Sequence, residues 1–393
     1  MRNSAWTFVL TIFVLSRLFF FGAGFVAVTH MPPLFGAGKE VPAPGFWDPW
    51  ASMDGGAYLE IASSGYELQK PQWTAFFPLF PMLIRVGAGW GGKPALWGVL
   101  VSLVATFFAL YFLYRIAEKH LGLKVARATV LTFAFFPTAF FLNAVYTEAL
   151  FVALSAGSFW TAAVRRDLLL AGVLGALAAA TRNLGVLLLI PLGYEWLSSR
   201  REFGWWRALY IGIVPAGLVG YMTFLWTRFG DPLITMEQQS AYWSREPTNP
   251  LTTLREAWNQ AWVGMRYFIL DDPTSLFFDQ RFYGAAFYAS RTVDLAFLFL
   301  FLILIGVGWA VLPDRLLGLW IFASVIVLYP LLWAGGWSPL MSLPRFLLDA
   351  FPIFFILGYL LSHSRPALYL WLFGSAGLGA VLAALFVTGR WVA

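Results

Sequence analysis

The residues best suited to acid–base chemistry lie in one polar stretch near the N-terminus. This stretch reads GFWDPWASMDGGAYLEIASSGYELQKPQWTAFFPLFP and contains the acids Asp48, Asp54, Glu60 and Glu67. Asp54 precedes Gly55-Gly56, whose backbone can turn tightly and let a ligand approach closely. A carboxylate in such a place can take a proton from an attacking hydroxyl and so act as a general base.

The same stretch also allows a structural role for Asp54. Small and apolar residues recur on one helical face after it, at Tyr58, Ile61, Ala62 and Gly65. This spacing predicts a short surface helix that begins near Asp54, and Asp is a favoured residue for capping a helix N-terminus. Asp48, between Trp47 and Pro49, is more typical of a residue that starts a turn.

A second group of candidates consists of polar residues inside or beside apolar runs, where they are costly unless they have a function or a partner. They are Arg17, Asn143, Tyr146, Glu148, Arg182, Asn183, Arg345 and Asp349. Arg182 interrupts a run of small and apolar residues, and an arginine at such a break can bind a phosphate through its forked donors.

Each of these arginines also has a structural alternative. Arg17 could pair with a neighbouring helix, and Arg182 could extend its charged end toward the membrane surface. Arg345 and Asp349 are four residues apart, which suits a local ion pair on a helix.

The composition of the 393-residue chain excludes a soluble protein, because 60% of the residues are hydrophobic and only 12% are charged. The absence of cysteine excludes disulfides, thiolate metal sites and cysteine nucleophiles. The three histidines are far apart and argue against a histidine metal site. We attribute the net charge of +6 to cytoplasmic Lys and Arg, and not to a nucleic-acid partner.

Apolar runs recur along the whole chain, and they predict helices that span the bilayer. They cover residues 5–28, 94–114, 125–143, 144–164, 168–181, 184–198, 206–228, 291–312, 315–334, 346–362 and 367–389. The sequence therefore predicts an all-α, polytopic transmembrane protein with about 11 spans, forming a single integral membrane domain over residues 1–393.

Lys and Arg in the short connections predict the orientation. The basic connections are Arg115 to Arg127, Arg165-Arg166, and Arg200 to Arg207. Placing them in the cytoplasm gives a cytoplasmic N-terminus and two long extracytoplasmic loops, 29–93 and 229–290. We expect the segment 75–92 of the first loop, rich in Pro, Gly and Ala, to be a re-entrant or interfacial piece.

The first loop resembles that of the PIG-V-like family, which comprises GPI mannosyltransferase II and its prokaryotic relatives within the C-type glycosyltransferase (GT-C) superfamily. The matching residues are Asp54, Tyr58, Ile61-Ala62, Gly65-Tyr66 and Phe76-Phe77-Pro78. Further similar segments are 135–155, the surroundings of Arg182, Gly230-Asp231-Pro232-Leu233 with Gln238 or Gln239 and Trp243, and Pro344-Arg345-Phe346.

The resemblance implies a GT-C fold and an inverting transfer of mannose. The donor would be a polyprenyl-phosphate mannose, such as dolichyl-phosphate mannose, and the acceptor a hydroxyl of an extracytoplasmic lipid or glycan. Asp54 would be the general base. With the polar residues above, the candidates for binding donor or acceptor are Asp48, Tyr58, Tyr66, Tyr146, Glu148, Arg182, Asn183, Arg345 and Arg17. We expect no cofactor, and a need for a divalent metal stays open.

Two other functions compete with this one. A transporter or flippase for lipid-linked sugars would be expected to show inverted repeats and paired broken helices. The sequence has no visible repeat, and its polar residues concentrate at the predicted outer face. A non-catalytic subunit would bind a polyprenyl-phosphate sugar or a glycan without turnover. We expect a multi-pass protein of the cell membrane, or of the endoplasmic reticulum membrane in a eukaryote, with a cytoplasmic N-terminus and an extracytoplasmic active site.

Overall fold

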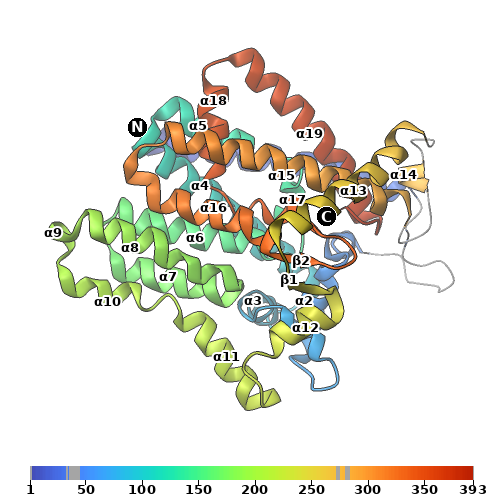
Figure 1. The fold of residues 1–393 in the computed structure, drawn as a ribbon, viewed down its shortest axis with the longest axis horizontal. Coiled ribbons are helices and arrows are strands. Elements are labelled where there is room, and N and C mark those ends of the chain that lie inside the picture. Colours follow the sequence, from blue (N-terminus) through green and yellow to red (C-terminus); the bar gives the residue numbers. More distant parts are fainter. Residues whose placement is uncertain (1, 32–33, 35–44, 271–274, 279–283, 393) are drawn as a thin grey trace.

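The computed structural model describes the chain except for residues 1, 32–33, 35–44, 271–274, 279–283 and 393. Parts of the predicted loops 29–93 and 229–290 therefore lie outside the described residues. The remainder is almost entirely helical, as predicted (Figure 1).

Within the described residues, five helices are long and apolar enough to cross a membrane. They are α1 (Arg2–His30), α4 (Pro94–Leu121), α15 (Ala285–Val311), α16 (Leu317–Leu332, preceded by the single turn η6, Asp314–Leu316) and α19 (Arg365–Val387). The turn η5 (Trp205–Arg207) with α10 (Ala208–Ile211) and the helix α11 (Ala216–Phe229) form a sixth, broken candidate with a bend of 42°. Pro215 lies at the break, where it cannot donate a helical hydrogen bond.

Shorter helices account for most of the other predicted spans. The apolar ones are α6 (Glu148–Ala163), α7 (Leu168–Thr181) and α18 (Ile353–Ser362), and a further short apolar helix, α3 (Leu79–Ala88), lies in the segment 75–92 that was predicted to be re-entrant or interfacial. They are joined by α5 (Leu123–Ala134), η3 (Ala139–Leu142), η4 (Asn183–Leu188), α8 (Leu189–Ser198) and α9 (Arg200–Phe203). The predicted count of about 11 spans is not confirmed, since among the described residues only five or six segments meet the requirement of length and composition.

Two predicted spans are shorter helices than expected because proline interrupts them. The run 125–143 is an α-helix only as far as Ala134, and Pro137 lies in the irregular segment that follows. The run 346–362 becomes helical only at Ile353, directly after Pro352. In both cases the irregular segment beside the helix contains a buried polar residue, Asn143 in the first and Asp349 in the second.

The remaining elements lie at one end of the molecule. They are η1 (Asp48–Ala51), α2 (Asp54–Ser64), η2 (Pro71–Ala75), α12 (Ile234–Trp243), β1 (Arg245–Pro247), α13 (Pro250–Ile269), α14 (Ser275–Phe278), β2 (Trp333–Gly335) and α17 (Leu343–Phe346). Strands β1 and β2 pair antiparallel, with Glu246 opposite Ala334. The surface helix predicted to begin near Asp54 is therefore present as α2.

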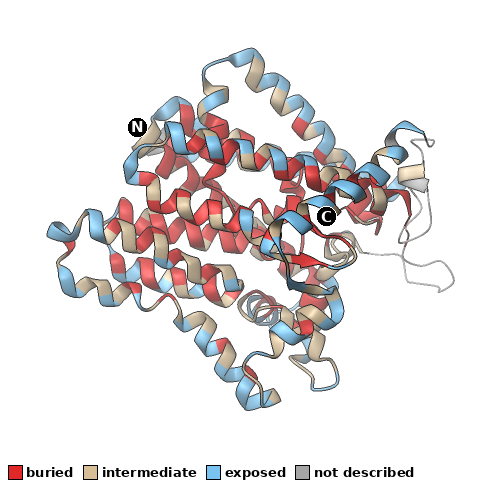
Figure 2. Ribbon diagram, viewed as in Figure 1, coloured by how far each residue is buried: buried red, intermediate tan, exposed pale blue. Residues whose placement is uncertain are grey.

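Buried residues fill the middle of the helix bundle, where α6 packs between α4 and α7, and α15 contacts α16 (Figures 1 and 2). Aromatic rings dominate one part of this core, with Phe136 in edge contact with Phe297, Phe301 and Phe354. Large apolar side chains are also exposed on the outer helices, for example Ile303 at 65% and Phe373 at 83%. A bilayer, and not water, is the solvent that suits such a surface.

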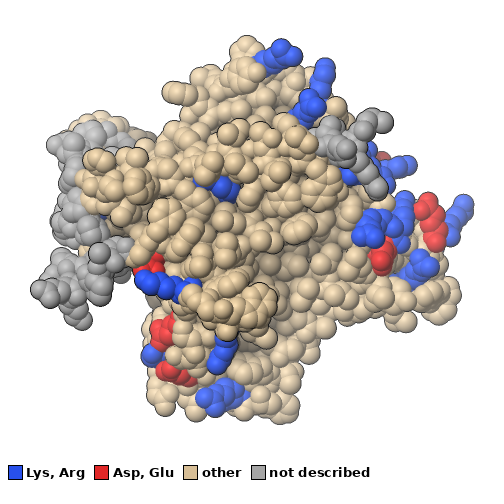
Figure 3. Space-filling view, turned by 180° about the vertical axis from the view of Figure 1, so that it is seen from behind, with Lys and Arg blue, Asp and Glu red and all other residues tan. Residues whose placement is uncertain are grey.

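The surface charges are distributed as expected for a membrane protein. In Figure 3 the Lys, Arg, Asp and Glu side chains gather mainly toward opposite ends of the view, and the broad surface between them carries few. With the apolar helices, this distribution identifies a multi-pass membrane protein.

The helix contacts depend on glycine at positions where backbones meet. In α11, a Cβ at Gly217 would lie 1.9 Å from the carbonyl oxygen of Ala176 in α7, whereas a Cβ at Gly220 would meet nothing within 4 Å. The two glycines lie one turn apart in one helix, and only Gly217 faces a neighbouring backbone within 4 Å.

We predict that Gly217→Ala lowers the melting temperature in detergent, because α11 must move away from α7. Gly220→Ala is the matched control and should leave the melting temperature unchanged or raise it, since Ala favours a helix over Gly by about 1 kcal/mol. Equal melting temperatures for the two variants would contradict the close approach of α7 and α11.

Candidate functional site

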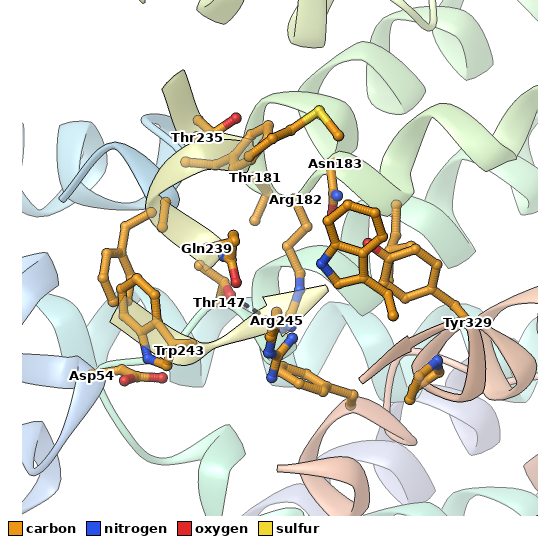
Figure 4. A pocket seen from close by; sticks show the side chains of 18 of the residues that line it. Asp54, Thr147, Thr181, Arg182, Asn183, Thr235, Gln239, Trp243, Arg245 and Tyr329 are labelled. Atoms are coloured by element: carbon orange, nitrogen blue, oxygen red, sulfur yellow. Dashed lines mark hydrogen bonds between the residues drawn. The ribbon is translucent and has the colours of Figure 1, made fainter. Parts of the chain in front are cut away.

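A cavity of about 490 Å³ lies where the first and second polar loops meet the bundle. Six of its lining residues are charged or carry a side-chain amide: Asp54, Arg182, Asn183, Gln239, Arg245 and Arg345. Figure 4 shows Arg182 and Arg245 near the middle of the cavity, with Asp54 and Trp243 on one side and Tyr329 on the other.

Asp54 is the first residue of α2 and directs its carboxylate toward Arg345. Its Oδ2 accepts a hydrogen bond from Arg345 Nη1 at 2.8 Å, although 291 residues separate the two in sequence. The N-cap position of α2 is occupied by Met53, and the Asp54 carboxylate accepts its hydrogen bond from Arg345 and not from the helix backbone. The N-cap alternative is therefore not what the carboxylate does in this structure.

The backbone around Asp54 is fixed by Tyr146. The Asp54 N–H donates to the Tyr146 hydroxyl, which in turn donates to the Ser52 carbonyl, both at 3.1 Å. Met53 has a φ of 57°, an uncommon backbone conformation for a residue with a side chain. Tyr146 thus holds an unusual turn that aims α2 at the cavity.

Behind Asp54 runs a chain of alternating charges. Arg345 Nε lies 3.2 Å from Glu148 Oε1, and the same oxygen accepts a hydrogen bond from Arg182 Nη1 at 2.8 Å. Arg182 Nε lies 3.3 Å from Asp349 Oδ2. The order is therefore Asp54–Arg345–Glu148–Arg182–Asp349, with three carboxylates and two guanidiniums.

The three carboxylates of this charge chain differ in exposure. The side chain of Asp54 is 30% exposed, whereas that of Glu148 is 1% and that of Asp349 is 0% exposed. The contacts of Arg345 Nε and of Asp349 do not have hydrogen-bond geometry, so these two links are Coulombic only. Asp54 is consequently the one carboxylate of the chain that a molecule in the cavity can reach.

The charge chain also decides two alternatives left open by the sequence. Arg345 and Asp349 do not pair with each other, because α17 ends at Phe346 and the chain turns before Asp349. Arg182 lies at the break between α7 and η4, as expected, but points inward to two carboxylates instead of toward the membrane surface.

Arg245 is a site residue that the sequence analysis missed. It lies on β1 and lines the cavity, with its guanidinium 5.2 Å from the centre of the Phe346 ring and Nη2 3.3 Å from the Met341 carbonyl oxygen. Among the described residues it forms no ion pair with an acidic side chain. Burial lowers the pKa of Arg245 to about 10, with a further lowering by the nearby charge of Arg345, so it stays cationic at neutral pH.

The rest of the cavity wall separates into a neutral polar part and an apolar part. Hydroxyl and amide groups come from Thr235 and Gln239 of α12 and from Thr147, Thr181 and Asn183 on the bundle (Figure 4). Apolar side chains come from η4, α11 and α16, namely Leu184, Leu218, Met222, Ile326 and Pro330. Such a cavity can hold an anionic group, sugar hydroxyls and a hydrocarbon chain together.

Of the remaining predicted site residues, all but Tyr58 lie outside the lining of this cavity. Tyr58 lines it, with its hydroxyl 3.4 Å from Thr147 Oγ1. Tyr146 and Glu148 lie behind the wall, as described above. Tyr66 donates to the Phe76 carbonyl at 2.6 Å and so supports the wall from outside.

Asp48 and Arg17 lie farther away and have other partners. Asp48 accepts from the Gly45 N–H at 2.8 Å and lies 3.4 Å from Lys93, in the turn predicted for it. Arg17 is buried and donates to the carbonyls of Ala134 and Ala139 at 2.8 Å and to Asn143 Oδ1 at 2.6 Å. It therefore satisfies carbonyls of the irregular segment that leads to Glu148.

A smaller cavity, of about 40 Å³, lies against the other side of the Asp54–Arg345 pair. Its lining includes Tyr146, Trp243, Ser342 and Trp391. Within the described part of the chain, no group of three or more His, Asp or Glu residues is arranged to hold a metal ion.

Comparison with known proteins gives a fold but no close relative. No protein-family profile matches the chain, and no curated protein matches its sequence. The fold is similar to that of ArnT from Cupriavidus metallidurans, solved bound to undecaprenyl phosphate, with a TM-score of 0.53 and 13% identity. The match covers 93% of this chain and 62% of ArnT, so the chain spans less than two thirds of that protein.

An oligosaccharyltransferase from Archaeoglobus fulgidus, solved with zinc and sulfate, is matched at 12% identity over 96% of this chain and 53% of that one. Its TM-score of 0.47 is too low to bear on the fold. The similarity to the fold of ArnT supports the predicted fold class, a polytopic, all-α membrane protein, and membership of the GT-C superfamily stays a prediction. Membership of the PIG-V-like subfamily stays a prediction.

The charge chain predicts a large loss of stability when its middle carboxylate is removed. Glu148→Gln leaves two buried guanidiniums short of one charge, and breaking a buried pair in this way costs about 3–5 kcal/mol. We expect a clear fall in melting temperature in detergent. Glu202→Gln is the control, because Glu202 is 65% exposed beside Arg166 and such surface pairs are worth at most about 1 kcal/mol. An unchanged melting temperature of the Glu148→Gln protein would show that the charge chain is dispensable for folding.

Proposed function

We propose that this protein is a glycosyltransferase that uses a polyprenyl-phosphate sugar as donor. The observation that carries the proposal is a reachable carboxylate, Asp54, in one cavity with a cation that has no acidic partner among the described residues, Arg245. A base for the acceptor hydroxyl and a cation for the leaving phosphate are the two groups that such a transfer needs.

In the proposed reaction the acceptor oxygen attacks the anomeric carbon of the donor sugar. A new C–O bond forms as the bond between that carbon and the phosphate oxygen breaks, which inverts the configuration. Asp54 takes the hydroxyl proton on Oδ1, since Oδ2 is held by Arg345. The electron pair of the broken bond leaves on the polyprenyl phosphate, whose charge faces Arg245.

The structure supports different roles for the three arginines. Arg182 and Arg345 each contact two carboxylates, so their charge is already compensated. We assign Arg345 to orienting Asp54 and Arg182 to holding the charge chain, with Arg245 as the phosphate ligand. Asn183, Thr235 and Gln239 would bind sugar hydroxyls, and the apolar wall between α11 and α16 would hold the first isoprene units.

The finer identity of the reaction rests on the sequence. The motif around Asp54 supports mannose as the sugar, a dolichyl-phosphate type of carrier, and a PIG-V-like enzyme acting on an extracytoplasmic lipid or glycan. The fold of a protein solved with undecaprenyl phosphate supports a polyprenyl-phosphate carrier. The basic cytoplasmic connections support a cytoplasmic N-terminus and an extracytoplasmic cavity.

We predict that Asp54→Asn lowers the transfer rate about 10²- to 10⁴-fold, the range for losing a general base, without loss of the folded protein. The assay incubates purified protein with polyprenyl-phosphate mannose and a lipid extract of its host, and detects new glycolipids by mass. Asp48→Asn is the control in the same loop and should keep its activity, because Asp48 lies outside the cavity. Full transfer by Asp54→Asn would remove Asp54 as the base, and sugar uptake by proteoliposomes without transfer would indicate a transporter.

Arg245→Ala should reduce kcat/KM for the donor about ten- to hundredfold, the value of one hydrogen-bonded charge. Arg245→Lys should recover part of this loss, since the ammonium keeps the charge but not the forked geometry. Arg255→Ala, an exposed arginine on the following helix, should behave as the unaltered protein. If Arg245→Ala keeps its donor kinetics, the phosphate is bound elsewhere.

A further inference from the structure

The helix α13 has an exposed apolar stripe that the proposed reaction does not use. Leu251, Trp258, Trp262 and Ile269 follow one another at intervals of seven, four and seven residues, which places them on one line along the helix. They are 76%, 58%, 67% and 69% exposed. Two tryptophans left open on a helix at the edge of the bundle call for a partner.

The opposite face of α13 is already occupied. Small residues on that face pack against the bundle: Thr253, Ala257, Ala261 and Gly264. Thr292 of α15 donates to the Ala261 carbonyl at 2.7 Å, and Thr253 donates to the Leu331 carbonyl of α16 at 2.9 Å. The orientation of the stripe is therefore fixed, and α13 cannot turn it inward.

Both helices that support α13 are candidate membrane spans. Each exposes apolar side chains of its own, Phe299 and Ile303 on α15, and Leu328 and Leu332 on α16. The helix α13 packs on the first turns of α15 and on the last turns of α16, and the last turns of α16 also line the cavity (Figure 1). The apolar stripe of α13 therefore lies beside two helices that themselves expose apolar side chains.

The residues beside the stripe indicate the depth of the helix. Arg255 and Arg266 lie within one quarter turn of it and are both exposed, and Arg255 contacts Glu256 at 3.5 Å. With these charges α13 is not among the helices able to span the bilayer. Tryptophan and arginine together are typical of the zone where hydrocarbon meets phosphate headgroups.

We propose that α13 is an interfacial helix that inserts the Trp258–Trp262 face into the bilayer leaflet on the side of the cavity, with Arg255 and Arg266 at the lipid phosphates. The helix follows directly on β1, and Thr248 between them bonds the Leu332 carbonyl and the Ala334 N–H at 2.9 and 3.1 Å. The membrane thereby anchors the wall of the cavity that carries Arg245. This holds whether or not the protein transfers a sugar.

The test uses the absence of cysteine in the chain, which lets a single introduced cysteine carry a nitroxide label. Labels at Trp258→Cys and Trp262→Cys are compared in lipid vesicles with one at Asn259→Cys, which is exposed and one residue, hence about 100°, around the helix from position 258. Ile303→Cys on α15 gives the value for a site in lipid. The measurement is collision with oxygen, which enters the bilayer, relative to collision with a water-soluble nickel chelate.

We expect the ratio of oxygen to nickel collisions at positions 258 and 262 to be several-fold higher than at 259 and to approach that at 303. A ratio at 258 and 262 equal to that at 259 would overturn the proposal in favour of a water-exposed face. Spin–spin broadening that disappears on dilution with unlabelled protein would overturn it in favour of a second copy of the chain. If one variant fails to fold, the other carries the same comparison.

Discussion

The arrangement of the site depends on a chain of buried charges that links distant parts of the sequence. Asp54 begins α2, Glu148 begins α6, Arg182 follows α7, and Arg345 and Asp349 precede α18. Buried charges are tolerated only when each is paired with an opposite charge. Removal of one charged side chain leaves its neighbour buried and unpaired. The segments must therefore come together as a group, which makes the charge chain a condition for the fold as well as for the cavity.

This requirement also limits which groups remain for chemistry. Arg182 and Arg345 are occupied by carboxylates, and Glu148 and Asp349 are enclosed, so a molecule in the cavity meets only Asp54 at the open end of the chain. The cation that faces it without an acidic partner comes from another segment, the strand β1. The proposed base, Asp54, and the proposed phosphate ligand, Arg245, thus stand on separate walls, as the proposed attack by a hydroxyl and departure of a phosphate on opposite sides of a sugar carbon would require.

Much of this could be predicted from the sequence, and the reasons for success and failure differ by residue. Glu148, Arg182 and Arg345 were identified because charged residues in apolar surroundings need a reason to be there. The partners of these residues could not be predicted. Asp54 and Arg345, for example, are 291 residues apart in sequence, and such a contact leaves no local sequence pattern. The spacing of Arg345 and Asp349 suggested an ion pair between them on one continuous helix. That pair is absent because the helix α17 ends at Phe346, before Asp349. Arg245 was missed because an arginine in a polar loop carries no cost that marks it.

The relative position of the two walls must in turn be fixed, and different interactions do this for each. The wall of Asp54 is held from inside by Tyr146 and by the charge chain. The wall of Arg245 has no such buried link among the described residues, and is held by the pairing of β1 with β2, by Thr248, and by the packing of α13 on α15 and α16. Hydrogen bonds of one short strand pair are exchangeable with water and are individually weak. The helix α13, which packs on two membrane spans and lies in the bilayer surface, restrains β1 over a much larger area. The position of the wall that carries Arg245 therefore depends on the membrane as well as on the protein.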